Sequence, residues 1–322
     1  MGAGQDDDDG SGCGTKACND ERGCMKNALT IDVEDYFQVT AFDGVVKRQD
    51  WMVYPSRVEN NTRRVLDLLD EFSLSGTFFV LGWVAEHYPG VVQAIANGGH
   101  EVACHGYGHD LVYNLQPHVF RSDVRRCKAL LEDLTGVPVL GYRAPSYSIT
   151  NNSMWALDIL IEEGFVYDSS IFPIVHDNYG IPGSHRFPYD IVRPGGTIRE
   201  FPLTTLAVNF AGRRIVLPIA GGGYLRLLPA GVVLWGMRSV NTTEKQPVVL
   251  YFHPWELDPD QPRIKARLRS RFRHYLNLDT TEEKVRSLLG ELRFDTMAQV
   301  LGLDGENGDE SASRTGLERS QP

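Results

Sequence analysis

The chain contains 322 residues, of which 42% are hydrophobic and 23% are charged. This composition is ordinary for a globular protein and excludes a wholly disordered chain, a collagen and a coiled coil. The formal net charge of −10 gives no general attraction for nucleic acid or for an anionic membrane, so nucleic acid is not expected as a partner. No run of 18 apolar residues is present, and we therefore expect no transmembrane segment.

The two ends of the chain differ in composition from the part between them. Residues 1–27 include four consecutive aspartates and almost no large apolar side chain, and residues 303–322 are rich in Gly, Glu, Ser and Arg. Such segments bury too little apolar surface to offset chain entropy, so we predict two disordered tails around one domain, 28–302. The N-terminal segment lacks the pattern of a secretory signal, and on that ground we expect a cytoplasmic protein.

The cysteines are Cys13, Cys18, Cys24, Cys104 and Cys127. Their odd number and irregular spacing favour reduced thiols in a reducing compartment over a disulfide framework. The first three lie together in a segment rich in Gly and Asp. Their spacing is not a standard zinc pattern, and a small metal clasp is the alternative interpretation.

Strand and helix patterns alternate through the predicted domain. Short apolar and β-branched runs predict strands at 28–33, 76–81, 100–105, 139–142, 165–167 and 248–252. Helical spacing of apolar residues predicts helices over about 58–72, 89–97, 124–134, 154–161 and 281–292, the last as an extension packed on the domain. Strand–helix–strand units in series predict parallel strands with helices outside, hence an α/β barrel or a doubly wound sheet. The region 181–230, rich in Pro and Gly, is predicted as loops with one β-hairpin.

Charged side chains and histidines follow these strands at their carboxyl ends. They come from five segments and comprise Asp32, Glu34 and Asp35, His105 and His109, Arg143, Asp168, and His253. Because the carboxyl ends of parallel strands meet on one face, we expect these side chains to share one site. Two histidines separated by three residues can share one face of a helical turn and, with a carboxylate, bind one metal ion with open positions for water and substrate.

Four segments, in this order, resemble the motifs of the polysaccharide deacetylase family (carbohydrate esterase family 4, with a NodB-homology domain). They are Leu-Thr-Ile-Asp-Val-Glu-Asp at 29–35, His105-x-x-x-His109, Arg-Ala-Pro-Ser-Tyr at 143–147 and Leu-Tyr-Phe-His at 250–253. The resemblance covers about residues 28–260. Within it, the runs at 32–39 and 253–257 resemble the branch associated with exopolysaccharide loci of bacteria that sort proteins by exosortase.

The resemblance implies a distorted (β/α) barrel and a divalent metal, usually zinc, with cobalt, nickel or manganese as alternatives. It implies removal of acetyl groups from an N-acetylated polysaccharide, as in exopolysaccharide biosynthesis. The roles it implies are a general base at Asp32, metal ligands at His105 and His109, an arginine paired with the base at Arg143, a backbone oxyanion donor at Tyr147 and a general acid at His253.

Three positions leave alternatives open. Val33 stands where the family has a second aspartate, so the metal carboxylate is Glu34 or Asp35, and the alternation of side chains along a strand favours Glu34. Gly106 stands where the family commonly has Ser or Thr, so a hydrogen bond that supports the metal loop is missing or replaced. The acidic partner of His253 is Asp168 or Asp177.

Other features have two interpretations each. Tyr36, Tyr147 and Trp255 line a glycan-binding groove or belong to the core. The alternating basic residues over 263–273 form an exposed helix flank, the interpretation we favour, or attract an anionic glycan, a lipid phosphate or nucleic acid. The alternatives to glycan deacetylation are hydrolysis of a small cyclic amide or ureide on the same scaffold, and an inactive glycan-binding module. The oligomeric state is left open.

Overall fold

The computed structural model describes residues 25–210, 212–219 and 221–303. Most of both predicted tails, and the three clustered cysteines, lie outside the described residues. Lys26 and Asn27 already belong to the first strand, so the structured domain begins before the predicted boundary at residue 28.

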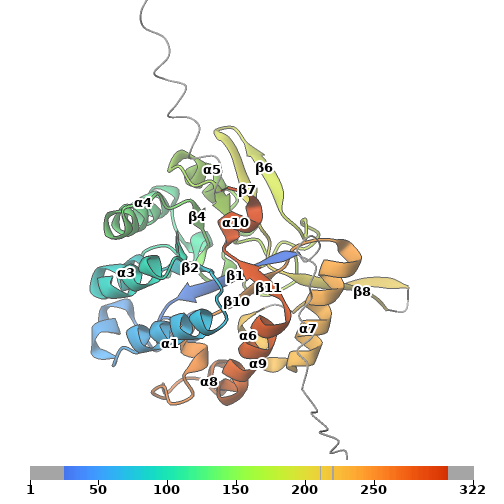
Figure 1. Ribbon diagram of the computed structural model, residues 1–322. Coiled ribbons are helices and arrows are strands. Elements are labelled where there is room, and N and C mark those ends of the chain that lie inside the picture. Colours follow the sequence, from blue (N-terminus) through green and yellow to red (C-terminus); the bar gives the residue numbers. More distant parts are fainter. Residues whose placement is uncertain (1–24, 211, 220, 304–322) are drawn as a thin grey trace, which may run out of the picture.

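A mainly parallel sheet forms the centre of the molecule (Figure 1). Within the described residues it contains nine strands, which are β1 (Lys26–Val33), β2 (Thr77–Val80), β3 (Glu101–Cys104), β4 (Gly141–Tyr142), β5 (Tyr167–Asp168), β6 (Tyr189–Arg193), β7 (Gly196–Glu200), β10 (Val249–Phe252) and β11 (Arg293–Asp295). Their order is β10-β1-β2-β3-β4-β5-β7-β6, with β11 also paired to β1. All neighbours are parallel except β6 and β7, which confirms the predicted α/β fold.

Helices cover the outside of this sheet (Figure 1). They are α1 (Val58–Glu71), α2 (Gly82–His87), α3 (Pro89–Asn97), α4 (Pro117–Thr135), α5 (Trp155–Glu162), α6 (Gly222–Leu227), α7 (Ala230–Ser239), α8 (Leu268–Tyr275), α9 (Leu278–Glu291) and α10 (Met297–Leu301). Helical turns at η1 (Thr40–Phe42), η2 (Arg48–Val53), η3 (Val112–Asn114), η4 (Pro145–Tyr147), η5 (Val240–Glu244) and η6 (Pro254–Leu257) connect them. No helix in the described part of the chain is long and apolar enough to cross a membrane.

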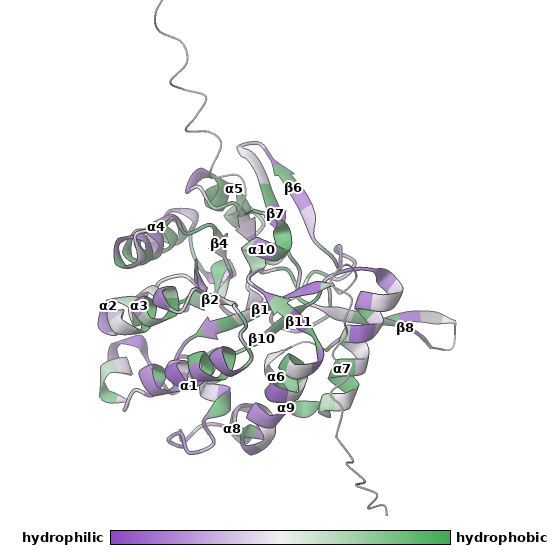
Figure 2. Ribbon diagram, in the orientation of Figure 1, coloured by the Kyte–Doolittle hydropathy of each residue, from purple (hydrophilic) through white to green (hydrophobic). Residues whose placement is uncertain are grey.

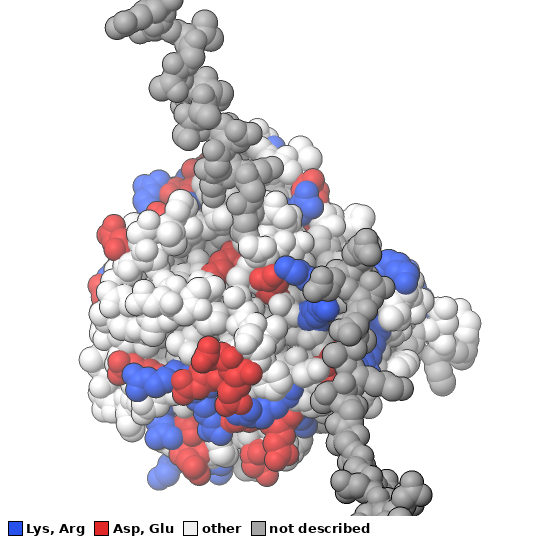
Figure 3. Space-filling model, in the orientation of Figure 1, with Lys and Arg blue, Asp and Glu red and all other residues white. Residues whose placement is uncertain are grey.

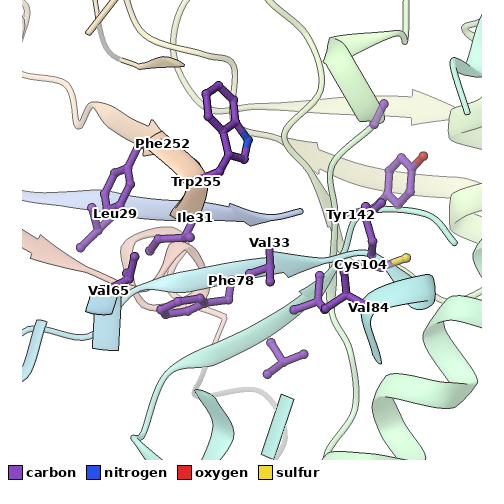
Figure 4. Close-up of a cluster of buried hydrophobic side chains, with 14 of the residues drawn as sticks. Leu29, Ile31, Val33, Val65, Phe78, Val84, Cys104, Tyr142, Phe252 and Trp255 are labelled. Carbon is purple, nitrogen blue, oxygen red and sulfur yellow. The ribbon is translucent and has the colours of Figure 1, made fainter. Parts of the chain in front are cut away.

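The two faces of β1 have different neighbours, and this difference positions the site. Leu29, Ile31 and Val33 belong to the cluster of apolar side chains that also includes Val65 of α1 and Phe78 of β2 (Figure 4). Side chains alternate along a strand, so Thr30 and Asp32 point to the opposite, interior face. Both faces of a parallel strand are normally buried, which is why the run that precedes Asp32 is continuously apolar or β-branched.

The region 181–230 contains more structure than the sequence predicted. It forms two hairpins, β6–β7 and the separate pair β8 (Thr205–Phe210) and β9 (Arg213–Pro218), followed by α6. The predicted extended pieces at 197–203 and 213–217 correspond to β7 and β9. Strand β7 pairs in parallel with β5, so this region extends the central sheet as well as decorating it.

The predicted C-terminal helix is confirmed as α9, whose Val285, Leu288 and Leu289 are buried. Apolar and polar residues are mixed around the outer helices (Figure 2), as expected for helices that cover a sheet on one side. Acidic and basic side chains intermingle near α1, α8 and α9 (Figure 3), where Arg64 pairs with Glu282 and Arg286 with Glu71. Exposed pairs of this kind contribute little to stability.

Candidate metal centre and active site

The carboxyl ends of β1, β3, β4 and β10 open into one pocket. Its lining includes residues that the sequence singled out from four separate segments, namely Asp32, Glu34, His105, His109, Tyr147 and His253. Arg143 lies beneath the pocket and is fully buried. The predicted convergence of strand ends is therefore observed.

Three side chains could hold a metal ion. The ligand atoms of Glu34, His105 and His109 all lie within 4.8 Å of one another. Two imidazoles and one carboxylate form a donor set that suits zinc and related divalent metals. Nε2 of His109 and Oε2 of Glu34 lie 2.8 Å apart, and by their donor types the residues present fit the metal that the sequence implied.

The protonation of His105 and of Glu34 also favours metal binding, whereas Glu34 outweighs burial and raises the pKa of His109, whose imidazole must lose a proton to bind a metal. His105 Nδ1 lies 2.8 Å from the carbonyl oxygen of Arg143, to which it donates, and this leaves Nε2 as the ligand atom. Burial lowers the pKa of His105 to about 4, so its imidazole is neutral near pH 7. Burial alone would raise the pKa of Glu34, but His109 and His253 lower it to about 2, which keeps the carboxylate charged.

The histidine loop is not helical, contrary to the helical turn that the spacing suggested. Residues 105–111 form a loop in which Gly106 and His109 both have a positive φ, of 73° and 55°. The Asp123 carboxylate on α4 accepts a hydrogen bond of 2.8 Å from the N–H of Tyr107. A Cβ at residue 106 would lie 3.0 Å from that carboxylate, so Gly106 leaves room for it. Asp123 thus supports the loop from a distant helix, and the sequence analysis missed it.

Asp32 and Arg143 form a buried pair. Nη1 of Arg143 donates to Oδ1 of Asp32 at 2.8 Å, and the guanidinium also donates to Thr30 and to Ser169. A buried charge is tolerated when it is paired and fully hydrogen-bonded. The predicted partnership of Arg143 with the base is therefore present.

His253 has a different acidic partner from the two that were predicted. Its Nδ1 lies 2.9 Å from Oε2 of Glu256. The other oxygen of that carboxylate, Oε1, accepts a hydrogen bond of 2.5 Å from Nε of Arg226. Burial opposes the charged imidazole, but Glu256, Glu34 and Asp32 raise the pKa of His253 to about 9. The spacing His-x-x-Glu, a capping-box pattern that η6 adopts, is the sequence signal that could have identified Glu256.

Asp168 and Asp177 are therefore wrong as partners of His253. In the described part of the chain, the side chain of Asp168 accepts from Ser170 and lies against Glu200, on the strands β5 and β7. Asp177 is exposed in a loop that lines a neighbouring hollow. Neither forms a hydrogen bond or an ion pair with His253.

Asp35 and Tyr36 also have other roles than predicted. Oδ2 of Asp35 accepts hydrogen bonds from the hydroxyl of Ser56 and from the backbone N–H groups of Arg57 and Val58, so this carboxylate caps the start of α1. It is not a member of the metal-ligand group, and Glu34 is. Tyr36 is fully buried with its ring edge-to-face against a neighbouring aromatic ring, and it belongs to the core instead of a glycan groove.

Tyr147 and Trp255 line the pocket but contribute differently from the prediction. The N–H of Tyr147 donates to the carbonyl oxygen of Ala144 at 3.0 Å, so it is not free to bind an oxyanion in this conformation. Trp255 is buried, and its ring stacks against His253 and His274. Its Nε1 donates to Oε1 of Glu34 at 3.2 Å, so its main contribution is to orient the metal carboxylate.

The family comparisons agree with this geometry. Residues 43–160 match the model described as polysaccharide deacetylase, and residues 169–302 match a domain of unknown function, DUF3473. Each model matches less than half of the chain. The first match contains His105, His109 and Arg143, and the second contains His253, so one pocket draws on both matched regions.

Several curated proteins resemble part of this chain. A peptidoglycan deacetylase-like protein, FGM2, of Gibberella zeae is 34% identical over 131 residues, 40% of this chain and 37% of that protein. A peptidoglycan-N-acetylglucosamine deacetylase of Bacillus cereus is 32% identical over 98 residues, 30% of this chain and 36% of that protein. The chain thus spans about a third of the length of these curated relatives.

Solved structures share the fold. A Mycobacterium smegmatis protein assigned to the polysaccharide deacetylases has a TM-score of 0.55 at 21% identity and covers 95% of this chain and 96% of its own. The Puue allantoinase structure has a TM-score of 0.54 at 14% identity, with 86% of this chain and 88% of that chain covered. At these identities the likeness shows the fold alone.

Proposed function

We propose that this protein is a metal-dependent hydrolase that removes N-acetyl groups from an N-acetylated polysaccharide. The observation that carries the proposal is the buried group of Glu34, His105 and His109, with Asp32 and His253 on its border. Nε2 of His253 lies 3.5 Å from Glu34 and 3.9 Å from Asp32, so acid and base face the same space. A module that only binds glycans needs neither a metal site nor an acid and a base beside it.

Each residue has a chemical task in this proposal. A bound divalent metal would polarise the acetyl carbonyl and acidify water. Asp32, held by Arg143, accepts a proton from the attacking water as general base. His253, oriented by Glu256, donates a proton to the nitrogen of the leaving amine as the amide bond breaks.

The pathway and the metal belong to the same proposal. The runs at 32–39 and 253–257 support an exopolysaccharide as the substrate, and the similarity to a peptidoglycan-N-acetylglucosamine deacetylase supports a glycan that contains N-acetylglucosamine. Two imidazoles with one carboxylate support zinc over magnesium or calcium, which prefer oxygen ligands.

Acetate release tests the proposal. Metal-supplemented protein is incubated with N-acetylglucosamine oligomers, an N-acetylated exopolysaccharide, peptidoglycan glycan strands and a cyclic ureide, and free acetate and ureide opening are measured. We expect acetate from at least one glycan and a loss of about a hundredfold or more in Asp32→Asn, which keeps the shape of the side chain but removes the base. Ureide opening without acetate release, or equal turnover in Asp32→Asn, would contradict the proposal.

A further inference from the structure

The metal pocket continues into a second hollow. Both are lined by Thr40, Ser146, Tyr179 and Arg273. The second hollow in turn shares Tyr179 with a third one, in which neutral amide and hydroxyl side chains gather, among them Tyr113, Thr150, Asn151, Asn152 and Asn178. A continuous groove of this kind has room for sugar units on one side of the unit at the metal.

Two arginines of α8 give the second hollow a positive charge. Arg269 and Arg273 lie one helical turn apart and both line it, and Arg273 also lines the metal pocket. Neither guanidinium has a hydrogen bond or an ion pair to an acidic side chain among the described residues. By contrast, most arginines elsewhere on this acidic protein, such as Arg57 and Arg193, are paired with a carboxylate.

The other titratable groups around this hollow do not cancel the charge. Its described lining contains one carboxylate, Asp177, against the two guanidinium groups, together with His176. Burial lowers the pKa of His176, and the positive charges of Arg273 and Arg269 act in the same direction. The positive charge of the two arginines therefore reaches the side of the groove where His176 lies.

We infer that this hollow binds an acidic group on a sugar next to the unit that is deacetylated, so that the substrate is an anionic polysaccharide. The acidic group is a carboxylate or a phosphate, because two guanidinium groups on one helix face can donate to either. The inference rests on the proposed function and specifies the class of its substrate. It also assigns a role to part of the basic run at 263–273, whose side chains at 269 and 273 face the groove.

Matched hexasaccharides test the inference. Each contains N-acetylglucosamine in alternate positions, and the intervening sugar is neutral, a uronate or a 6-phosphate sugar. KM for acetate release is measured for the wild-type protein, for the double variant Arg269→Gln/Arg273→Gln, and for Arg271→Gln as control. Arg271 is exposed on the same helix and is not among the groove-lining residues, and its substitution removes one positive charge where the double variant removes two.

We expect KM about tenfold lower for one anionic hexasaccharide than for the neutral one, since charge-assisted hydrogen bonds are about twice as strong as neutral ones. Preference for the uronate or for the phosphate identifies the acidic group. The double variant should lose this preference, and Arg271→Gln should keep it. Equal KM values in the wild type, or the same loss in Arg271→Gln, would overturn the inference.

A binding measurement separates failure of this inference from failure of the proposed function. If no hexasaccharide releases acetate, the proposed function fails, and calorimetric titration of the same three hexasaccharides then tests the hollow alone. Tighter binding of an anionic hexasaccharide that disappears in the double variant supports an anion-binding groove. Equal binding of all three overturns it.

Discussion

Asp32 and His253 each have a charged partner within hydrogen-bond distance, and each partner comes from a different segment. Arg143, which follows β4, holds Asp32, and Glu256 in η6 holds His253. Arg226 on α6 in turn donates to Glu256, so Arg226, Glu256 and the imidazole of His253 form a chain of three hydrogen-bonded groups. Such partners fix the tautomer and the orientation of a catalytic side chain.

Replacement of Glu256 by Gln tests this chain. The amide keeps the shape of the side chain but removes the charge that holds His253, so we expect kcat to fall about tenfold to a hundredfold, within the range of general acid–base contributions. Metal content by elemental analysis should remain at the wild-type value. Asp260→Asn, an exposed acid in the same segment, is the control with the same change of charge. An unchanged kcat would remove Glu256 from the mechanism.

At the scale of elements, the metal loop depends on two helices that contribute no ligand. Gly82 and Trp83 at the start of α2 donate backbone hydrogen bonds to the carbonyl oxygens of Gly106 and Tyr107, and Asp123 on α4 accepts from Tyr107. These bonds replace the side-chain support that the glycine cannot give. The left-handed conformation of His109 persists because the loop is held on both sides.

Substitution of Asp123 by Ala should therefore weaken metal binding. Removal of a group that orients metal ligands typically costs a factor of about ten to a hundred in metal affinity, and we expect that range here. Competition with a chromogenic chelator measures the affinity, and circular dichroism checks the fold. Asp133→Ala, at an exposed position of the same helix, should bind metal like the wild type. Equal affinity in both variants would show that the loop needs no support from α4.

The start of α1 provides a second test at this scale, because it separates Asp35 from Glu34. Asp35 caps the helix, so Asp35→Ala should lower the free energy of unfolding by about 1–2 kcal/mol, as loss of an N-cap does, without loss of metal. Glu34→Gln should lose metal. Urea unfolding and elemental analysis measure the two effects, and loss of metal in Asp35→Ala would contradict the assignment.

Strand ends were predictable from the sequence, and contacts between distant segments were not. Asp32, His105, His109, Arg143 and His253 each follow an apolar run, and a parallel sheet brings such positions together whatever the details of packing. The support of the histidine loop by Asp123 depends on how α4 docks, which local patterns do not encode. The capping of α1 by a residue outside the helix was unpredictable for the same reason. Glu256 lies only three residues from His253 in a local capping-box pattern, and the prediction of Asp168 or Asp177 as the partner overlooked that pattern.

At the scale of the whole molecule, the two regions that match family models join within one sheet. Strand β5 lies between the matches at 43–160 and 169–302 and pairs with β7 of the second, and this pairing brings Asp168 beside Glu200. Both side chains are fully buried. Oδ2 of Asp168 and Oε2 of Glu200 receive no hydrogen bond from another donor among the described residues, so we expect the two carboxyl groups to share a proton.

A proton shared by Asp168 and Glu200 makes the stability of the pairing between β5 and β7 depend on pH. Burial raises the pKa of Asp168 to about 6 and, with the charge of Asp168, raises the pKa of Glu200 well above its ordinary value. At pH values above about 4, the ordinary pKa of a carboxyl group, the folded protein therefore binds more protons than the unfolded chain does. The stabilisation is complete below that range and is lost as pH rises through about 6 and beyond.

Glu200→Gln should remove this dependence, because an amide can donate to Asp168 at every pH and can still accept from the N–H of Ile171. Urea unfolding of the wild-type and variant proteins, both with metal chelated so that pH-dependent metal binding does not contribute, measures the difference. We expect similar free energies of unfolding at pH 5 and a variant more stable by about 1 kcal/mol or more at pH 8, since one pKa unit corresponds to about 1.4 kcal/mol. Parallel profiles across this range would mean that no proton is shared between Asp168 and Glu200.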